Sequence, residues 1–113
     1  MSQEKVVFVA SSAAPAISPE PGMSRQVLAY SDKLMIVRNT FGKDWVGARH
    51  AHPHEQSIYV VKGHIRFEAE GKSWELHTGD SLVVAGGVAH QASAFEPSEV
   101  LDIFTPFRED YAK

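Results

Sequence analysis

Three histidines stand close together in one short segment, and their side chains are the strongest candidates for chemistry in this sequence. His50, His52 and His54 alternate with other residues, and Gln56 follows at the same parity. On an extended chain, side chains two residues apart point to one face, so the segment can present imidazoles and an amide oxygen together. Such groups bind a metal ion when a ligand from another strand completes the site. Parity alone does not choose among the three histidines.

Composition limits the classes of protein and of site. There is no cysteine, which excludes disulfides, thiol nucleophiles and thiolate metal ligands, so a metal must be bound through nitrogen or oxygen. Eleven basic and 14 acidic residues give a formal net charge of −3, which argues against nucleic-acid binding. No apolar run approaches the ~18 residues of a membrane span, and Val6–Ala10 is too short for a signal peptide. We therefore expect a cytoplasmic protein that binds neither nucleic acid nor membranes.

The elements that position the histidines are predicted to be short β-strands. Runs of strand-forming residues, separated by turn residues, occupy 26–30, 34–41, 45–50, 56–62, 64–70, 73–77, 81–85, 88–94 and 99–105. The run 64–70 alternates polar and apolar residues, as in a half-buried strand, and Glu70-Gly71-Lys72 is typical of a hairpin turn. No segment has a helical period. Short strands at this spacing predict an all-β sandwich or barrel.

The 113 residues make up one domain's length, with a distinct N-terminal part. Residues 1–24 are predicted to form a short strand, at Val6–Ala10, and then an arm rich in proline, alanine and serine through which no helix can run. Residues 25–113 are predicted to form the single folded domain. The arm is a candidate for packing on a neighbouring subunit.

Two motifs in this domain resemble those of the small cupins. The first comprises His50, His52, Gln56 and Gly63, and the second comprises Gly79, Gly87 and His90, all at the spacing of that family. Asp44, Ala85 and Ala94 depart from the family pattern at positions that concern turn geometry more than metal binding. The resemblance implies a conical antiparallel β-barrel, or jelly roll. It also implies one divalent metal ion bound by His50, His52, Gln56 and His90, with His54 at the rim of the site, and a homodimer.

A narrower resemblance covers roughly residues 25–111. Val27–Met35, His50–Gln56 and Asp102–Tyr111 are similar to segments of the unsaturated pyranuronate lyases of pectin degradation. That family converts a 4,5-unsaturated uronate monosaccharide, released from pectin or alginate, into its linear keto form. The resemblance implies that Asp102, Phe104 and Arg108 are active-site residues beside the four metal ligands. The implied substrate is a small anionic sugar.

This set of residues suits that chemistry. Three imidazoles and an amide are neutral, so they leave the charge of a divalent ion uncompensated and favour an anionic ligand and Lewis-acid catalysis. Asp102 would transfer the proton, and Arg108 would hold the substrate carboxylate with two hydrogen bonds. Asp102 and Phe104 share strand parity, so both can face one cavity, where Phe104 would form an apolar wall. Ordinary ion pairs or core packing are the alternative roles of these three residues.

Two other functions remain open at this stage. The same metal site would serve a small iron-dependent cupin dioxygenase, which oxygen uptake would reveal. A non-catalytic metal- or sugar-binding cupin would bind its ligand and leave it unchanged. The sequence does not choose among zinc, nickel, iron and manganese.

Overall fold

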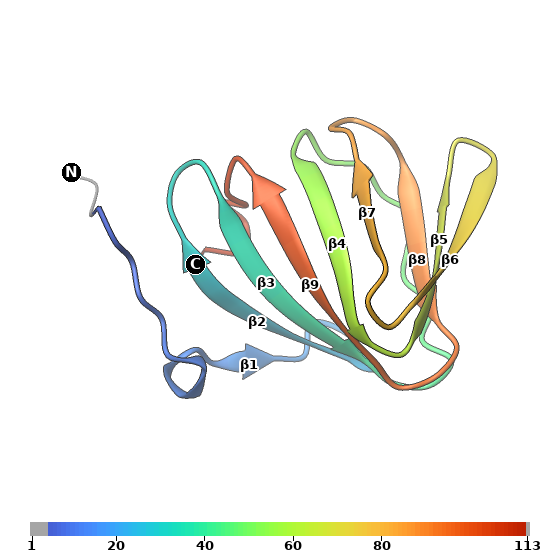
Figure 1. Cartoon of the computed structure of the whole chain (residues 1–113), viewed down its shortest axis with the longest axis horizontal. Coiled ribbons are helices and arrows are strands. Elements are labelled where there is room, and N and C mark those ends of the chain that lie inside the picture. Colours follow the sequence, from blue (N-terminus) through green and yellow to red (C-terminus); the bar gives the residue numbers. More distant parts are fainter. Residues whose placement is uncertain (1–4, 113) are drawn as a thin grey trace.

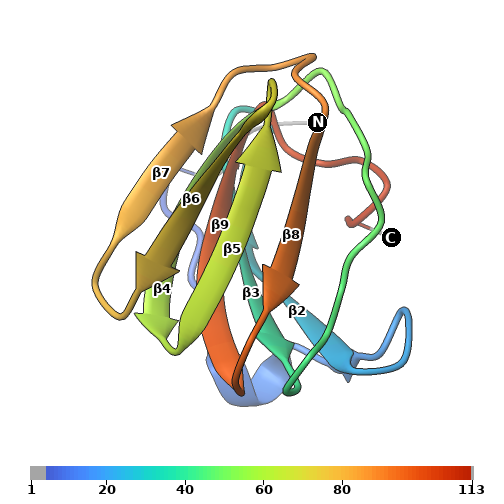
Figure 2. The ribbon, with the colours of Figure 1, turned by 90° about the vertical axis from the view of Figure 1, so that its right-hand side faces the viewer.

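The computed structural model describes residues 5–112, in which one three-residue 3-10 turn at Ser11–Ala13 accompanies nine β-strands. The strands are β1 (Ala16–Ile17), β2 (Met23–Tyr30), β3 (Met35–Phe41), β4 (Glu55–Lys62), β5 (His64–Ala69), β6 (Lys72–His77), β7 (Ser81–Val84), β8 (His90–Ala94) and β9 (Ser98–Thr105). They form a six-stranded sheet in the order β1-β2-β3-β9-β4-β7 and a three-stranded sheet in the order β6-β5-β8, with antiparallel pairing throughout. The two sheets face each other and diverge towards one end (Figures 1 and 2). This is the predicted conical antiparallel barrel.

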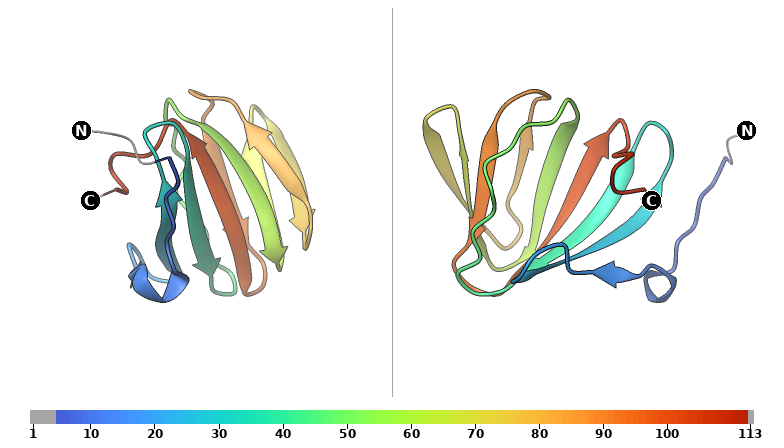
Figure 3. Two further views of the ribbon diagram at one scale, coloured as in Figure 1. Left: turned by 60° about the vertical axis from the view of Figure 1, so that its left-hand side comes forward. Right: turned by 180° about the vertical axis from the view of Figure 1, so that it is seen from behind.

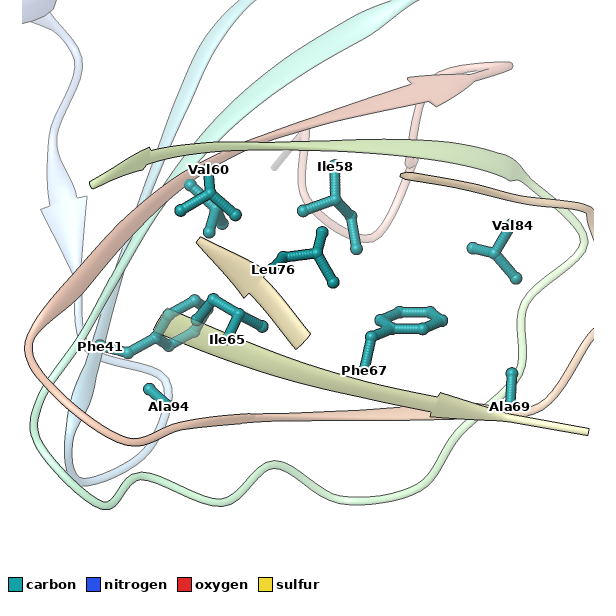
Figure 4. Packing of buried hydrophobic residues seen from close by; sticks show 10 residues of the cluster. Phe41, Ile58, Val60, Ile65, Phe67, Ala69, Leu76, Val84 and Ala94 are labelled. Carbon is teal, nitrogen blue, oxygen red and sulfur yellow. The ribbon is translucent and has the colours of Figure 1, made fainter. Parts of the chain in front are cut away.

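Strict alternation in β3 and β9 determines what faces the interior. Both strands bury every second residue. Apolar side chains of the two sheets meet in the main core, where Phe67 and Leu76 point towards Ile58 and Val60 (Figure 4). A second, smaller cluster contains Met35, Val37 and Phe104. The buried polar residues Asn39, Gln56 and Asp102 lie on the same inner faces, at strand positions next to these apolar residues.

The hairpin from β5 to β6 is confirmed. Its loop is Glu70-Gly71, and both residues have positive φ, 53° and 74°. A two-residue loop with this conformation has the twist that antiparallel strands need.

The predicted strand over residues 45–50 is wrong. Residues 42–54 form an irregular connection that runs along the small sheet beside β8 before the chain enters β4 (Figure 3, right). It makes only isolated bridges, from Val46 to Ser93 and from His50 to His90. Gly47 lies within the connection, where a Cβ would come within 2.6 Å of the Trp45 ring, so glycine permits the close approach of this ring.

Gly86 and Gly87 hold this connection close to the other end of β8. A Cβ on Gly86 would lie 2.2 Å from the Pro53 carbonyl oxygen, so only glycine permits this approach. The Gly87 amide donates a hydrogen bond of 2.8 Å to the His52 carbonyl. Gly87 has φ +83°, which glycine adopts without strain. The glycine pair therefore places His52 opposite the start of β8.

The N-terminal strand predicted at Val6–Ala10 is also wrong, because these residues have no strand conformation and no neighbouring strand. The arm instead contains β1, which pairs with β2. Gln26 donates side-chain hydrogen bonds to the carbonyls of Ser11 and Ala14, which hold the arm against β2. Residues 5–10 extend away from the barrel (Figure 1). In the described part of the chain, no helix is long and apolar enough to cross a membrane.

Candidate metal centre

His50, His52 and His90 converge at the open end of the barrel. One ring nitrogen of each lies within 4.8 Å of those of the other two, which is close enough for a single ion to contact all three. His50 lies on the irregular connection and pairs with His90 at the first residue of β8 through two backbone hydrogen bonds, 2.9 and 3.0 Å long. His52 and His90 are buried, and His50 is exposed. His54 lies outside this cluster of three.

Each of the three imidazoles is oriented by a hydrogen bond from its Nδ1–H to a nearby backbone carbonyl. The acceptors are Ala48 for His50 at 3.1 Å, His54 for His52 at 3.0 Å, and Val88 for His90 at 2.9 Å. Because a carbonyl only accepts, each Nδ1 carries a proton, so in the neutral imidazole the lone pair is on Nε2. Burial lowers the pKa of His52 and of His90, which keeps both rings neutral, as metal ligands must be.

The side-chain oxygen of Gln56 lies beside His52, one of the three imidazoles. Gln56 Nε2 donates to Asp102 Oδ1 at 2.9 Å, which turns Oε1 towards His52 Nε2, 3.0 Å away. Because the proton of His52 is on Nδ1, a lone pair of His52 Nε2 faces a lone pair of Gln56 Oε1, with no hydrogen between them. The buried Nε2 of His90 also has no hydrogen-bond partner in the protein. A cation among these atoms would satisfy all of them, so the donor set fits the divalent metal that the sequence implied.

Asp102 is buried on the inner face of β9, as strand parity predicted. It accepts hydrogen bonds from the side-chain amides of Gln56 and Asn39, and these oppose the effect of burial, which raises its pKa. A buried carboxyl with a raised pKa gains and loses a proton more readily near neutral pH than an exposed one. The hydrogen bond from Gln56 links this carboxyl directly to a candidate metal ligand.

The structure brings Phe104 and Arg108 to the same region. Phe104 is buried on the inner face of β9, and its ring edge contacts His52 with centroids 5.7 Å apart. Arg108 is buried, and its Nε and Nη2 donate to the two carboxylate oxygens of Asp110 at 3.0 and 2.8 Å. This edge of the guanidinium is therefore already occupied. Of the guanidinium nitrogens, Nη1 makes no ion pair with a carboxylate in the described part of the chain.

A cavity of about 300 Å³ connects these groups. His50, Gln56, His90, Asp102, Phe104 and Arg108 line it together. Asn39, Arg25 and Tyr111 also line it, and the sequence analysis had missed them as site residues. Asn39 carried a usable signal, since it is a polar residue at the buried parity of the strand over 34–41. Arg25 carried none, because the predicted strand began after it.

These features define a class: a small β-barrel with a three-histidine site inside its open end. The family model described as "Cupin domain" matches residues 38–104. The pectin degradation protein KdgF of Dickeya dadantii is 35% identical over 92 residues, which cover 80% of this chain and 84% of that protein.

Two solved structures agree with this relationship. KdgF from a Halomonas species superposes with a TM-score of 0.89 and is 36% identical, over 95% of this chain and 99% of that one. An RmlC-like cupin from Shewanella frigidimarina superposes with a TM-score of 0.88 and is 33% identical, over 96% of each chain. The chain therefore belongs to the cupin family and, within it, to the group of the pectin degradation protein KdgF.

Proposed function

We propose that this cupin is an enzyme that opens the ring of 4,5-unsaturated uronate monosaccharides from pectin or alginate breakdown. The observation that carries the proposal is the direct hydrogen bond between a buried carboxyl, Asp102, and the amide of Gln56, whose oxygen lies 3.0 Å from His52 in the cluster of three histidines. This arrangement sets a proton-transfer group beside a Lewis-acid site. The likeness to KdgF proteins supports a role in pectin degradation.

One divalent ion, zinc, nickel, iron or manganese, is proposed to be bound by His50, His52, Gln56 and His90. When bound, it supplies Lewis-acid stabilisation of negative charge on a substrate oxygen. The neutral ligand set leaves its charge uncompensated, which favours a small anionic sugar as the ligand.

Asp102 is proposed to carry out the proton transfers of the reaction. Asp102 takes the proton of the anomeric hydroxyl as the bond between C1 and the ring oxygen breaks. C1 becomes a carbonyl, and the electron pair of the broken bond stays on the former ring oxygen, which gives an enolate with its double bond between C4 and C5. Return of the one proton to C4 converts this enolate to the 5-keto form, so no redox step is needed. Asp102 is positioned for that second transfer as well. Asn39 Oδ1 is buried without a partner and lines the cavity, where it can accept a hydrogen bond from a sugar hydroxyl.

Phe104 and Arg108 are proposed to position the sugar. Phe104 gives the cavity an apolar wall that can pack on the sugar ring. Arg108 is held by Asp110 along one edge, and its other edge can donate to the substrate carboxylate.

The test is the loss of ultraviolet absorbance of an unsaturated uronate, because ring opening and ketonisation remove its conjugated double bond. We expect the metal-loaded protein to accelerate this loss well above the spontaneous rate, and chelation to abolish the acceleration. A product that remains isomeric with the substrate, without oxygen uptake, distinguishes this reaction from that of a dioxygenase. A spontaneous rate in the presence of loaded protein, with ligand bound and unchanged, would instead indicate a binding module.

A homodimer is proposed to form through the N-terminal arm. Val6 and Phe8 are 82% and 85% exposed on a segment that extends away from the barrel (Figure 1), and apolar surface of this kind is stabilised by a second copy. We expect light scattering to give the mass of a dimer, and the double variant Val6→Ser with Phe8→Ser to shift it towards the monomer. A monomeric wild-type protein, or a dimer unaffected by both substitutions, would contradict this proposal.

A further inference from the structure

We propose that Arg25 is a specificity-determining residue of the same cavity, and that its guanidinium binds the carboxylate of the ligand. This inference rests on the proposed function for the identity of the ligand as a uronate. It adds a second arginine to the site, one that the family resemblance did not indicate.

The position of Arg25 on β2 aims its side chain at the site. Arg25 pairs directly with Asn39 of β3, and residues paired across antiparallel strands project to the same face of the sheet. Asn39 is buried and donates to Asp102. Arg25 therefore lies on the inner face of the six-stranded sheet, one strand away from Asn39, and both line the cavity.

Arg25 differs from three other arginines of the chain because no carboxylate pairs with it. Arg38 pairs with Glu99, Arg66 with Glu75, and Arg108 with Asp110. Within residues 5–112, Arg25 takes part in no ion pair, and its Nε, like that of Arg38, is buried without a hydrogen-bond acceptor. A buried donor without an acceptor is costly, so an acceptor supplied by a ligand would be bound favourably.

The guanidinium of Arg25 is nevertheless oriented. Its Cζ lies 3.8 Å from the centroid of the Tyr111 ring, and the Cζ of Arg108 lies 4.1 Å from the same centroid. The aromatic ring thus supports two cationic groups through their faces, so that contact with it does not use their N–H donors. A carboxylate bound beside Tyr111 would meet both arginines. A neutral sugar would leave the donor of Arg25 unpaired.

Binding of a saturated uronate tests this assignment without requiring turnover. D-galacturonate carries the carboxylate, and D-galactose has the same ring with a neutral group in its place. We expect calorimetry to give tighter binding of galacturonate than of galactose to the wild-type protein, with and without metal. Arg25→Gln should weaken galacturonate binding about tenfold or more and leave galactose binding unchanged, because one charge-assisted contact is lost.

Two further variants separate recognition from structure. Arg25→Lys keeps the charge and loses the planar fork, so it should restore part of the affinity, and it carries the test where Arg25→Gln does not fold. Arg38→Gln, on the outer face of the adjacent strand, is the matched control and should bind galacturonate as the wild type does. In the absorbance assay, Arg25→Gln should raise KM by a similar factor, with kcat within about threefold.

The outcomes separate this inference from the proposed reaction. Arg25-dependent galacturonate binding in a protein that opens no unsaturated uronate would leave the carboxylate subsite standing and reject the reaction. Ring opening with unchanged KM and unchanged galacturonate affinity in Arg25→Gln would reject the subsite alone. Equal binding of galacturonate and galactose by the wild-type protein would also overturn the role of Arg25.

Discussion

Asp102→Asn is expected to lower kcat of ring opening by a factor of about 100 to 10,000 while leaving the metal bound. The substitution removes the group that gains and loses the proton and keeps the size of the side chain. Its new amide presents one oxygen and one NH2 to two neighbours that both donate to Asp102, the amides of Gln56 and Asn39. Asn39 can turn over and offer its unpaired Oδ1 to the new NH2, so Gln56 keeps its orientation towards the imidazoles.

Metal content and the absorbance assay, measured on the same preparation, check this result. Glu99→Gln is the matched control, because Glu99 also lies on β9 but on its outer face, where it pairs with Arg38 at 3.4 Å. We expect that control to retain wild-type turnover. An Asp102→Asn protein that binds metal and turns over at nearly the wild-type rate would reject the proton-transfer role of this carboxyl.

The residues that the sequence singled out do converge in the structure, but the path of the chain that brings them together was predicted less well. Spacing and family resemblance indicated His50, His52, Gln56 and His90, and the structure brings these residues together. The assumption that the histidine segment is an extended strand was only partly right. β4 begins at Glu55, and His50 and His52 lie on an irregular connection. Their convergence depends on backbone pairing with β8 and on the close approach that Gly86 permits, which no local pattern encodes.

Contacts between distant segments were beyond sequence reasoning for a physical reason. Asn39 and Asp102 are 63 residues apart in the chain, and their contact depends on β3 and β9 being neighbours in the sheet. Alternation gives the face of each residue but not the order of the strands. In the apolar stretch Val6–Ala10, in contrast, a local pattern was present but the predicted strand did not form. Its composition suits a strand, but a strand also needs a partner, and none lies beside it.

A hydrogen-bonded series runs from Asn39 through Asp102 to Gln56, whose Oε1 lies 3.0 Å from Nε2 of His52. Each member is buried and fixes the next, so the amide oxygen of Gln56 is aimed before any ion arrives. Preorganisation of this kind lowers the cost of ordering ligands on metal binding. The position of the Gln56 amide thus depends on Asp102, the proposed proton-transfer group.

His50→Ala is expected to remove metal-dependent activity and to weaken metal binding by at least about 100-fold, since one of three converging imidazoles is lost. His50 is exposed, so its truncation leaves the core intact, unlike that of His52 or His90. A divalent ion at a hundred times its Kd stabilises the fold by about 2.7 kcal/mol, which for a domain of this size raises Tm by roughly 10 °C. We expect that shift in the wild-type protein and its absence in His50→Ala.

Thermal unfolding with and without metal, together with metal content, separates this effect from a loss of stability. His77→Ala is the matched control, because His77 is a histidine of β6 whose side chain is 63% exposed and outside the cluster of three. It should keep the full metal-dependent shift in Tm. If His50→Ala shows the same shift and the same metal content as the wild type, the ion is bound elsewhere and the proposed centre is wrong. If the shift is lost in His50→Ala and kept in His77→Ala, His50 is a ligand of the metal, and any activity that disappears with it is metal-dependent.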